Sequence, residues 1–178
     1  MDYYKNLFKT QFTGLAFVIG IIAMIISIFT YREILTYIAF INLFAVFDVV
    51  GYGNMIAMPS AEGVERWYDE TILVPYRIMQ NMFMVLAFIA VYFYAGWICL
   101  FACFVGWWMG GCDLLYYILL RIKMREEDYY WMKGWSVWLP ITLLRRLLLA
   151  NEYISRIEFI SICSIGLILG GVINFVKV

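Results

Sequence analysis

The sequence predicts an all-α integral membrane protein: a bundle of about five transmembrane helices with a short interfacial amphipathic helix before the last span. Three observations lead to this prediction. Hydrophobic residues make up 65% of the chain and charged residues only 15%, whereas soluble domains have about 45–50% and about 25%. The apolar residues gather in runs of about 20 with almost no charge, as transmembrane helices require. No internal repeat or soluble domain interrupts these runs, so we expect residues 1–178 to form a single transmembrane domain.

The first two spans are predicted at about 12–29 and about 35–58. Two lysines precede the first run, as in a signal peptide, but the run lacks a small-residue cleavage site. We therefore expect it to remain in the protein as a span. A short polar turn separates the two spans, and Pro59 is expected to end the second.

The third and fourth spans come from one long apolar stretch. Residues 78–120 contain a single charged residue, Asp113. One helix of this length would be about 65 Å long, whereas the hydrocarbon core of a bilayer is about 30 Å thick. Two spans, at about 78–95 and about 98–120, must therefore be joined by a reversal. Ala95-Gly96-Trp97 is the expected turn, because glycine adopts unusual backbone angles and tryptophan favours the membrane interface.

An interfacial segment is predicted at about 129–150, followed by a fifth span at about 157–176. Three tryptophans recur at spacings of four and three residues, which places their indoles on one face of a helix. Two arginines follow among leucines and can extend their charged groups toward water. The expected interfacial anchors are Trp131, Trp135, Trp138, Arg145 and Arg146.

The distribution of basic residues predicts the orientation of the chain. With five spans and the N-terminus inside, every lysine and arginine except Arg32 and Lys177 falls on the cytoplasmic side. This agrees with the positive-inside rule. We therefore expect the N-terminus inside and the C-terminus outside, in a cytoplasmic or organellar inner membrane.

Two acidic residues lie within predicted spans, where a charged group is expensive. Asp48 is in the second span and Asp113 in the fourth, and both are expected in the inner half of the membrane at a similar level. They could form a proton or cation pathway, a catalytic pair, a contact with another subunit, or interhelical hydrogen bonds that hold helices in register. The expected intramembrane polar cluster comprises Asp48, Asp113, Asn54, Gln80 and Asn81.

Two G-x-x-x-G patterns occur in the last two spans, and such patterns let helix backbones approach closely in a membrane. The second glycine of the first pattern is followed by another glycine and then by Cys112 and Asp113. Close packing between the fourth and fifth spans is the simpler interpretation, and a broken helix that exposes carbonyl groups is the alternative. The expected helix-packing residues are Gly106, Gly110, Gly111, Gly166 and Gly170.

Several classes of function are disfavoured by the composition. The chain has no histidine, the usual ligand for haem iron and catalytic zinc and the commonest general base. Its four cysteines lie in apolar stretches, and its formal net charge is zero. We therefore expect no metal, no cofactor, no catalytic residues of the histidine-dependent classes and no nucleic-acid partner.

These observations favour a small non-catalytic polytopic subunit of a larger membrane protein complex, which packs and stabilises helices of partner subunits. Its expected partners are membrane lipids and other membrane subunits, in a hetero- or homo-oligomer. One alternative is a small oligomeric proton- or cation-linked transporter or channel that uses Asp48 and Asp113. A second alternative is a two-aspartate intramembrane hydrolase.

Overall fold

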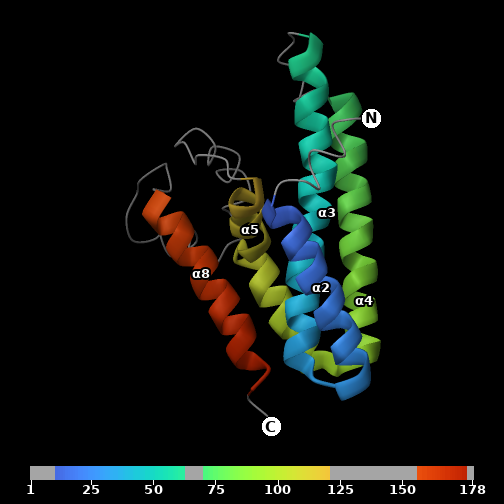
Figure 1. The fold of residues 1–178 in the computed structure, drawn as a ribbon, viewed down its shortest axis with the longest axis vertical. Coiled ribbons are helices and arrows are strands. Elements are labelled where there is room, and N and C mark those ends of the chain that lie inside the picture. Colours follow the sequence, from blue (N-terminus) through green and yellow to red (C-terminus); the bar gives the residue numbers. More distant parts are fainter. Residues whose placement is uncertain (1–10, 63–69, 121–155, 176–178) are drawn as a thin grey trace.

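The computed structural model describes residues 11–62, 70–120 and 156–175, and every regular element in these ranges is a helix (Figure 1). The all-α class predicted from the sequence is therefore confirmed for this part of the chain. The described helices are α2 (Gln11–Thr30), α3 (Glu33–Glu62), α4 (Glu70–Trp108), α5 (Gly111–Leu120) and α8 (Arg156–Ile173). The predicted interfacial segment at 129–150, with its tryptophans and arginines, lies outside the described residues.

Successive segments run in alternating directions (Figure 1). The α2–α3 turn, the bend at Gly96 within α4 and the C-terminal end of α8 all lie at the bottom of that view, and we call this end of the bundle the turn end. Within the described ranges, three helices contain stretches long and apolar enough to cross a membrane: Phe12–Thr30, Glu33–Gly51 and Ile78–Trp108. The first two have 19 residues each, which corresponds to about 28 Å of helix.

The turn between α2 and α3 is made by Tyr31 and Arg32. Tyr31 has a positive φ of 51°, a left-handed conformation that commonly ends a helix. The carbonyl of Arg32 then accepts hydrogen bonds from the backbone N–H groups of Leu35 and Thr36 and so begins α3. Glu33 lies in the first turn of α3, where a negative charge interacts favourably with the helix dipole.

The chain reverses at Gly96, where the sequence analysis places a turn. Gly96 interrupts α4 with φ 80° and ψ −178°, a conformation that is open to glycine and costly for other residues. The ring of Phe88 before the bend lies 6.1 Å from that of Phe104 and 5.9 Å from that of Trp107 after it. In a straight helix, Phe88 and Phe104 would be about 24 Å apart along the axis. The two halves of α4, residues 70–95 and 97–108, therefore fold back on each other.

Two predicted boundaries differ from the structure. The predicted span at 98–120 is not one continuous helix, because the chain turns at Met109 and Gly110 before α5 begins; Gly110 has a positive φ of 82°. In addition, α3 continues through Pro59 to Glu62. Proline removes one backbone hydrogen bond from a helix, and in α3 this loss does not end the helix.

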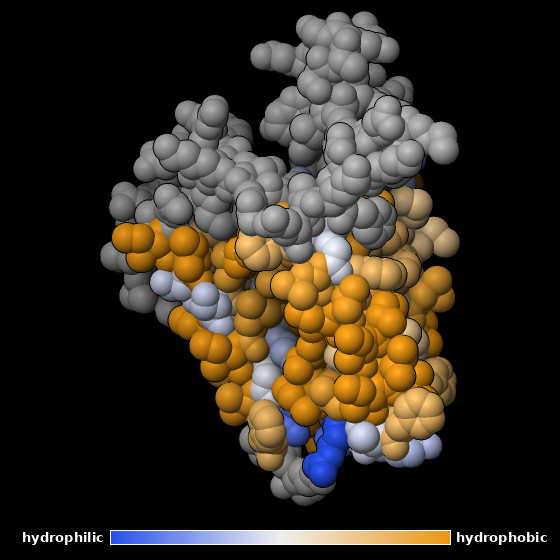
Figure 2. Space-filling model, in the orientation of Figure 1, coloured by the Kyte–Doolittle hydropathy of each residue, from blue (hydrophilic) through white to orange (hydrophobic). Residues whose placement is uncertain are grey.

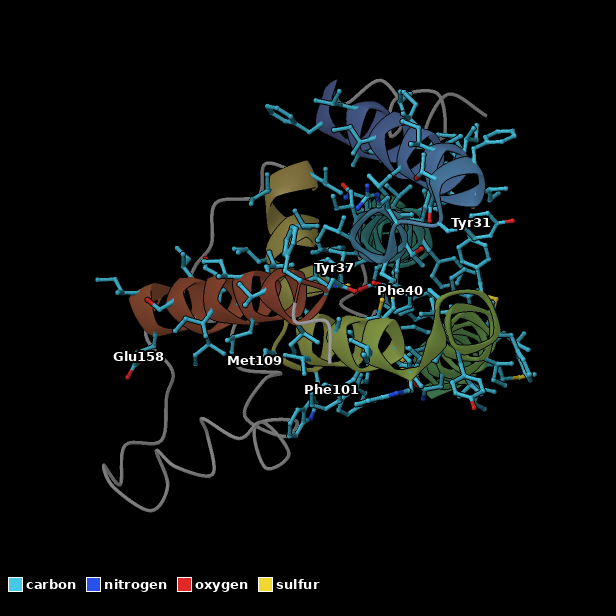
Figure 3. The ribbon with its side chains drawn as sticks, turned by 90° about the horizontal axis from the view of Figure 1, so that it is seen from below. Tyr31, Tyr37, Phe40, Phe101, Met109 and Glu158 are labelled. Atoms are coloured by element: carbon cyan, nitrogen blue, oxygen red, sulfur yellow. The ribbon has the colours of Figure 1, made fainter. Side chains whose placement is uncertain are left out.

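Helix α3 is the central helix of the bundle and packs against α2, α4 and α5. One core cluster joins Val46 and Val49 of α3 to Leu114 of α5 and Phe159 of α8. A second joins Phe40 and Phe44 of α3 to buried residues in both halves of α4. Figure 3 shows Tyr37 and Phe40 between α3 and the second half of α4. The outer faces of α2, α4 and α8 expose large apolar side chains, and the face in Figure 2 is largely hydrophobic.

Four glycines lie where α8 meets the second half of α4 and α5. A Cβ atom at Gly106 or Gly170 would come within 2.6 Å of the Tyr37 hydroxyl, so the tyrosine ring fits against both backbones. A Cβ at Gly166 would lie 2.4 Å from Cβ of Met109, and one at Gly111 would lie 2.6 Å from a methyl carbon of Leu167. The Tyr37 hydroxyl also donates a hydrogen bond to the carbonyl oxygen of Leu167, at 2.9 Å. α8 thus approaches its neighbours at distances that side chains would prevent.

We predict that Gly170→Ala destabilises the bundle while Gly171→Ala does not. The added methyl at position 170 would clash with Tyr37 and with the carbonyl oxygen of Ala102, whereas a Cβ at position 171 meets nothing within 4 Å. Overpacking of this kind lowers the free energy of unfolding by about 1–3 kcal/mol. The control should be unchanged or gain up to about 1 kcal/mol, because alanine favours helix over glycine. Thermal unfolding in detergent measures both, and equal effects would contradict the packing described here.

Candidate functional site

Asp48 on α3 is buried and accepts two hydrogen bonds from α4. The Tyr76 hydroxyl donates to its Oδ1 at 2.6 Å, and the Gln80 Nε2 donates to the same oxygen at 2.5 Å. All three side chains are buried, with exposed fractions of 9% for Asp48, 5% for Tyr76 and 9% for Gln80. We call these three residues the Asp48 cluster. The cluster connects two helices whose other contacts are largely apolar.

The helical geometry of α3 and α4 explains the arrangement. Tyr76 and Gln80 are four residues apart and so lie on one face of α4. On α3, Gly51 follows Asp48 by three residues and lies on the same face as Asp48. A Cβ atom at Gly51 would come within 2.5 Å of a ring carbon of Tyr76. The missing side chain at Gly51 therefore lets the tyrosine approach α3 closely enough to reach the carboxyl group.

The Asp48 cluster lies well away from the turn end. Asp48 is fifteen residues beyond Glu33 along α3, and Gln80 is fifteen residues before Ala95 along α4, which corresponds to about 22 Å in each helix. The donors and the acceptor are thus at one level because the two helices are antiparallel and leave the turn end together (Figure 1).

Asp113 lies in the first turn of α5 and is half-buried. Helix α5 packs against α3, and one core cluster contains Ala45 and Val49 of α3 together with Leu114 of α5. The buried thiol of Cys112, next to Asp113, lies 4.0 Å from the carbonyl oxygen of Ile41 on α3. Asp48 and Asp113 thus lie on two helices that pack against each other. The hydrogen bonds from Tyr76 and Gln80 direct the Asp48 carboxyl group toward α4.

The other residues of the expected polar cluster are placed differently. Gln80 contacts Asp48 directly, whereas its neighbour Asn81 is exposed on the outer face of α4. Adjacent residues on a helix point about 100° apart, so the two amides cannot share one site. The backbone of Asn54 belongs to α3, but its side chain is outside the described part of the structure. Tyr76 was not singled out from the sequence, because it lies in a segment with many charges; its four-residue spacing from Gln80 is the signal that could have identified it.

A second set of polar contacts joins α2, α3 and α4 at the turn end. The hydroxyl groups of Ser27 and Thr36 are 2.6 Å apart and join α2 to α3. The Tyr94 hydroxyl donates a hydrogen bond to the carbonyl oxygen of Ser27, at 2.5 Å, and so joins α4 to α2. Like the Asp48 cluster and the Tyr37–Leu167 hydrogen bond, these contacts use polar groups to join neighbouring helices.

The described ranges contain no group of three or more histidine, cysteine, aspartate or glutamate residues that could hold a metal ion. Cys99, Cys103, Cys112 and Cys163 are free thiols, and each is buried. They pack in the two apolar core clusters, where a cysteine behaves as a small hydrophobic residue. Comparison of the chain with protein-family models, with curated proteins and with solved structures gives no match.

We predict that Asp48→Ala destabilises the protein more than Asp48→Asn does. Alanine removes the acceptor that two buried donors share, at a cost of about 1–3 kcal/mol. Asparagine can keep an oxygen at the same position, and its cost should remain below about 2 kcal/mol because interhelical hydrogen bonds in membranes are modest. The free energy of unfolding in mixed micelles measures both effects. Combining Asp48→Ala with Tyr76→Phe should give less than the sum of the two single effects, and strict additivity would show that the two groups do not interact.

Gly51→Ala provides an independent test of the same contact. The new methyl group would displace the Tyr76 ring, so we expect a loss of about 1–3 kcal/mol in the free energy of unfolding. In a Tyr76→Ala background the clash partner is gone, and Gly51→Ala should then have little effect or be mildly stabilising. A cost that is the same in both backgrounds would mean that Gly51 is not needed for the approach of Tyr76.

Proposed function

We propose that this chain is an integral membrane protein that serves as a small non-catalytic subunit of a larger membrane complex. In this proposal it crosses the membrane five times, with the N-terminus inside and the C-terminus outside, and it packs against helices of partner subunits. The membrane placement is supported by three helices that are long and apolar enough to cross a bilayer. It is also supported by the large apolar side chains that two of these helices, α2 and α4, expose.

The observation that carries the functional proposal is the environment of Asp48. A carboxyl group that serves a pathway needs access to an ion or to water along the route. Asp48 is instead buried, and one of its oxygens accepts hydrogen bonds from Tyr76 and Gln80 of the neighbouring helix. This arrangement supports a structural role for Asp48 in holding α3 against α4. The contacts of Tyr37 and Ser27 use polar groups in the same way, so the polar chemistry of the described residues favours assembly over catalysis.

The close packing of α8 supports a rigid subunit. Glycines 106, 111, 166 and 170 bring α8 against α4 and α5 with little free space, and the opposite face of α8 exposes Ile160, Ile168 and Val172. In a membrane, small residues at helix contacts give close van der Waals packing. A rigid bundle with apolar outer faces is suited to binding helices of other subunits.

A transporter or channel is the second candidate, and the break between α4 and α5 is the observation that favours it. Gly110 has a positive φ, and Asp113 lies in the first turn of α5, which begins at Gly111. Interrupted helices with polar residues at the break bind ions in several transporter folds. On this view Asp48 and Asp113 would both be needed for proton or cation flux.

Extraction of the protein from its native membrane in a mild detergent tests the proposal. We expect it to co-purify with other membrane proteins in fixed stoichiometry. A particle that contains only this chain would contradict a role as a subunit of a hetero-complex. Flux measurements in proteoliposomes with Asp48→Asn and Asp113→Asn then separate the candidates. Abolished flux in folded variants would favour the transporter, whereas no flux in the unaltered protein would exclude it.

A further inference from the structure

The turn end of the bundle carries the most exposed aromatic side chains of the described residues. Five large hydrophobic side chains in these ranges are more than 70% exposed, and four of them lie at this end: Phe29 at 79%, Tyr31 at 78%, Phe93 at 81% and Phe175 at 73%. They come from the end of α2, the α2–α3 turn, the bend in α4 and the end of α8. Apolar side chains in the middle of the same outer faces are less exposed, as for Ile25 at 46% and Ile89 at 47%.

Two of the aromatic residues at this end are held in place. The rings of Tyr31 and Tyr94 stack with their centroids 6.3 Å apart, and the Tyr94 hydroxyl is bonded to the carbonyl of Ser27. Tyr31 has a positive φ, which costs a residue with a side chain about 1–2 kcal/mol and is usually left to glycine. The Tyr31 ring is 78% exposed although it stacks on Tyr94, so most of its surface faces the surroundings of the bundle.

The chemistry of this end changes in a definite order along the helix axis. Above it, α2 and α4 expose aliphatic side chains such as Ile22 and Leu86. Next come the rings of Phe93 and Trp97, and beyond them the exposed charged residue Arg32 in the turn. Figure 2 shows hydrophilic atoms at the bottom of the molecule, directly below the hydrophobic face. Tyrosine and tryptophan favour the headgroup region because their rings are apolar while their hydroxyl and N–H groups can bond to water or lipid.

We propose that the turn end is a lipid-contact surface whose aromatic residues lie at the headgroup level of one leaflet and fix the depth of the bundle. The occupant is the phospholipid interface, because the order of aliphatic, aromatic and charged residues matches the order of acyl chains, headgroups and water. The anchoring residues are Phe29, Tyr31, Phe93, Tyr94, Trp97 and Phe175. The inference rests on the membrane placement proposed above, and it adds the side chains that set this placement.

Two positions on the outer face of α4 allow a direct test. Leu86 and Phe93 are seven residues apart, so they share one face and lie about 10 Å apart along the helix. Both are exposed, at 62% and 81%. Each is replaced by cysteine in turn and labelled with a fluorescent bimane. The native cysteines are buried, and labelling of the unaltered chain gives the background.

The labelled proteins are reconstituted into phosphatidylcholine vesicles that contain a nitroxide either near the lipid headgroup or near the end of the acyl chain. We expect the shallow nitroxide to quench the label at position 93 at least about twofold more strongly than the deep one. The label at position 86 should show the reverse preference. Stronger quenching of position 93 by the deep nitroxide would overturn the proposal. So would the absence of lipid quenching at position 93 in a protein whose position 86 is quenched.

The label at position 86 distinguishes an error in the membrane placement from an error in the proposed headgroup surface. If lipid quenches neither position 86 nor position 93, the membrane placement itself is wrong. If lipid quenches position 86 but the label at position 93 is not shallow, only the proposed headgroup surface is wrong.

A second variant, in which Tyr31, Tyr94 and Trp97 are all replaced by leucine, tests the anchoring role. The shallow-to-deep quenching ratio at position 93 should fall in this variant, and an unchanged ratio in a folded protein would show that these side chains do not set the depth.

Discussion

The reversal at Gly96 is the constraint on which the rest of the described bundle depends. One helix over the apolar residues 78–120 would be about twice as long as the hydrocarbon core of a bilayer is thick, and in the structure the chain turns within this stretch. Glycine makes that turn possible because its φ of 80° would strain other residues. The reversal brings residues 97–108 against α3, and the Tyr37 ring then fits between Gly106 of this segment and Gly170 of α8. Without it, α8 would lose the surface against which it packs.

Polar groups inside the bundle are used mainly to connect helices. Asp48 joins α3 to α4, Tyr37 joins α3 to α8, and Ser27 joins α2 to α3. Apolar packing alone distinguishes poorly between alternative alignments of apolar helices, because lipid tails are as apolar as leucine. A buried hydrogen bond favours one alignment, since sliding either helix leaves polar groups without partners. This explains how a chain so rich in hydrophobic residues can specify one arrangement, in which Asp48 holds α3 against α4.

The sequence was sufficient for the features that depend on composition and length. The helical class and the reversal near Gly96 follow from long apolar runs and the thickness of a bilayer. The break at Met109 and Gly110 was less accessible, because two adjacent glycines fit both close packing and a turn. In the structure Gly110 makes the turn, while Gly111 lies against Leu167. Tyr76 was missed because its charged neighbours suggested a loop, and Asn81 was grouped with Gln80 because composition does not reveal which face of a helix a residue occupies.

The distance across the bend in α4 is the most direct test of the reversal at Gly96. Spin labels on cysteines that replace Phe88 and Phe104 report this distance by dipolar broadening in a bilayer, and a pair at Ile34 and Val50 of the uninterrupted α3 provides a control with the same sequence separation. The fold described here predicts strong broadening for the first pair, because the native rings lie 6.1 Å apart, and much weaker broadening for the control at about 24 Å. Equal, weak broadening for both pairs would mean that α4 is one straight helix, and the arrangement of α3, α5 and α8 described here would then be wrong.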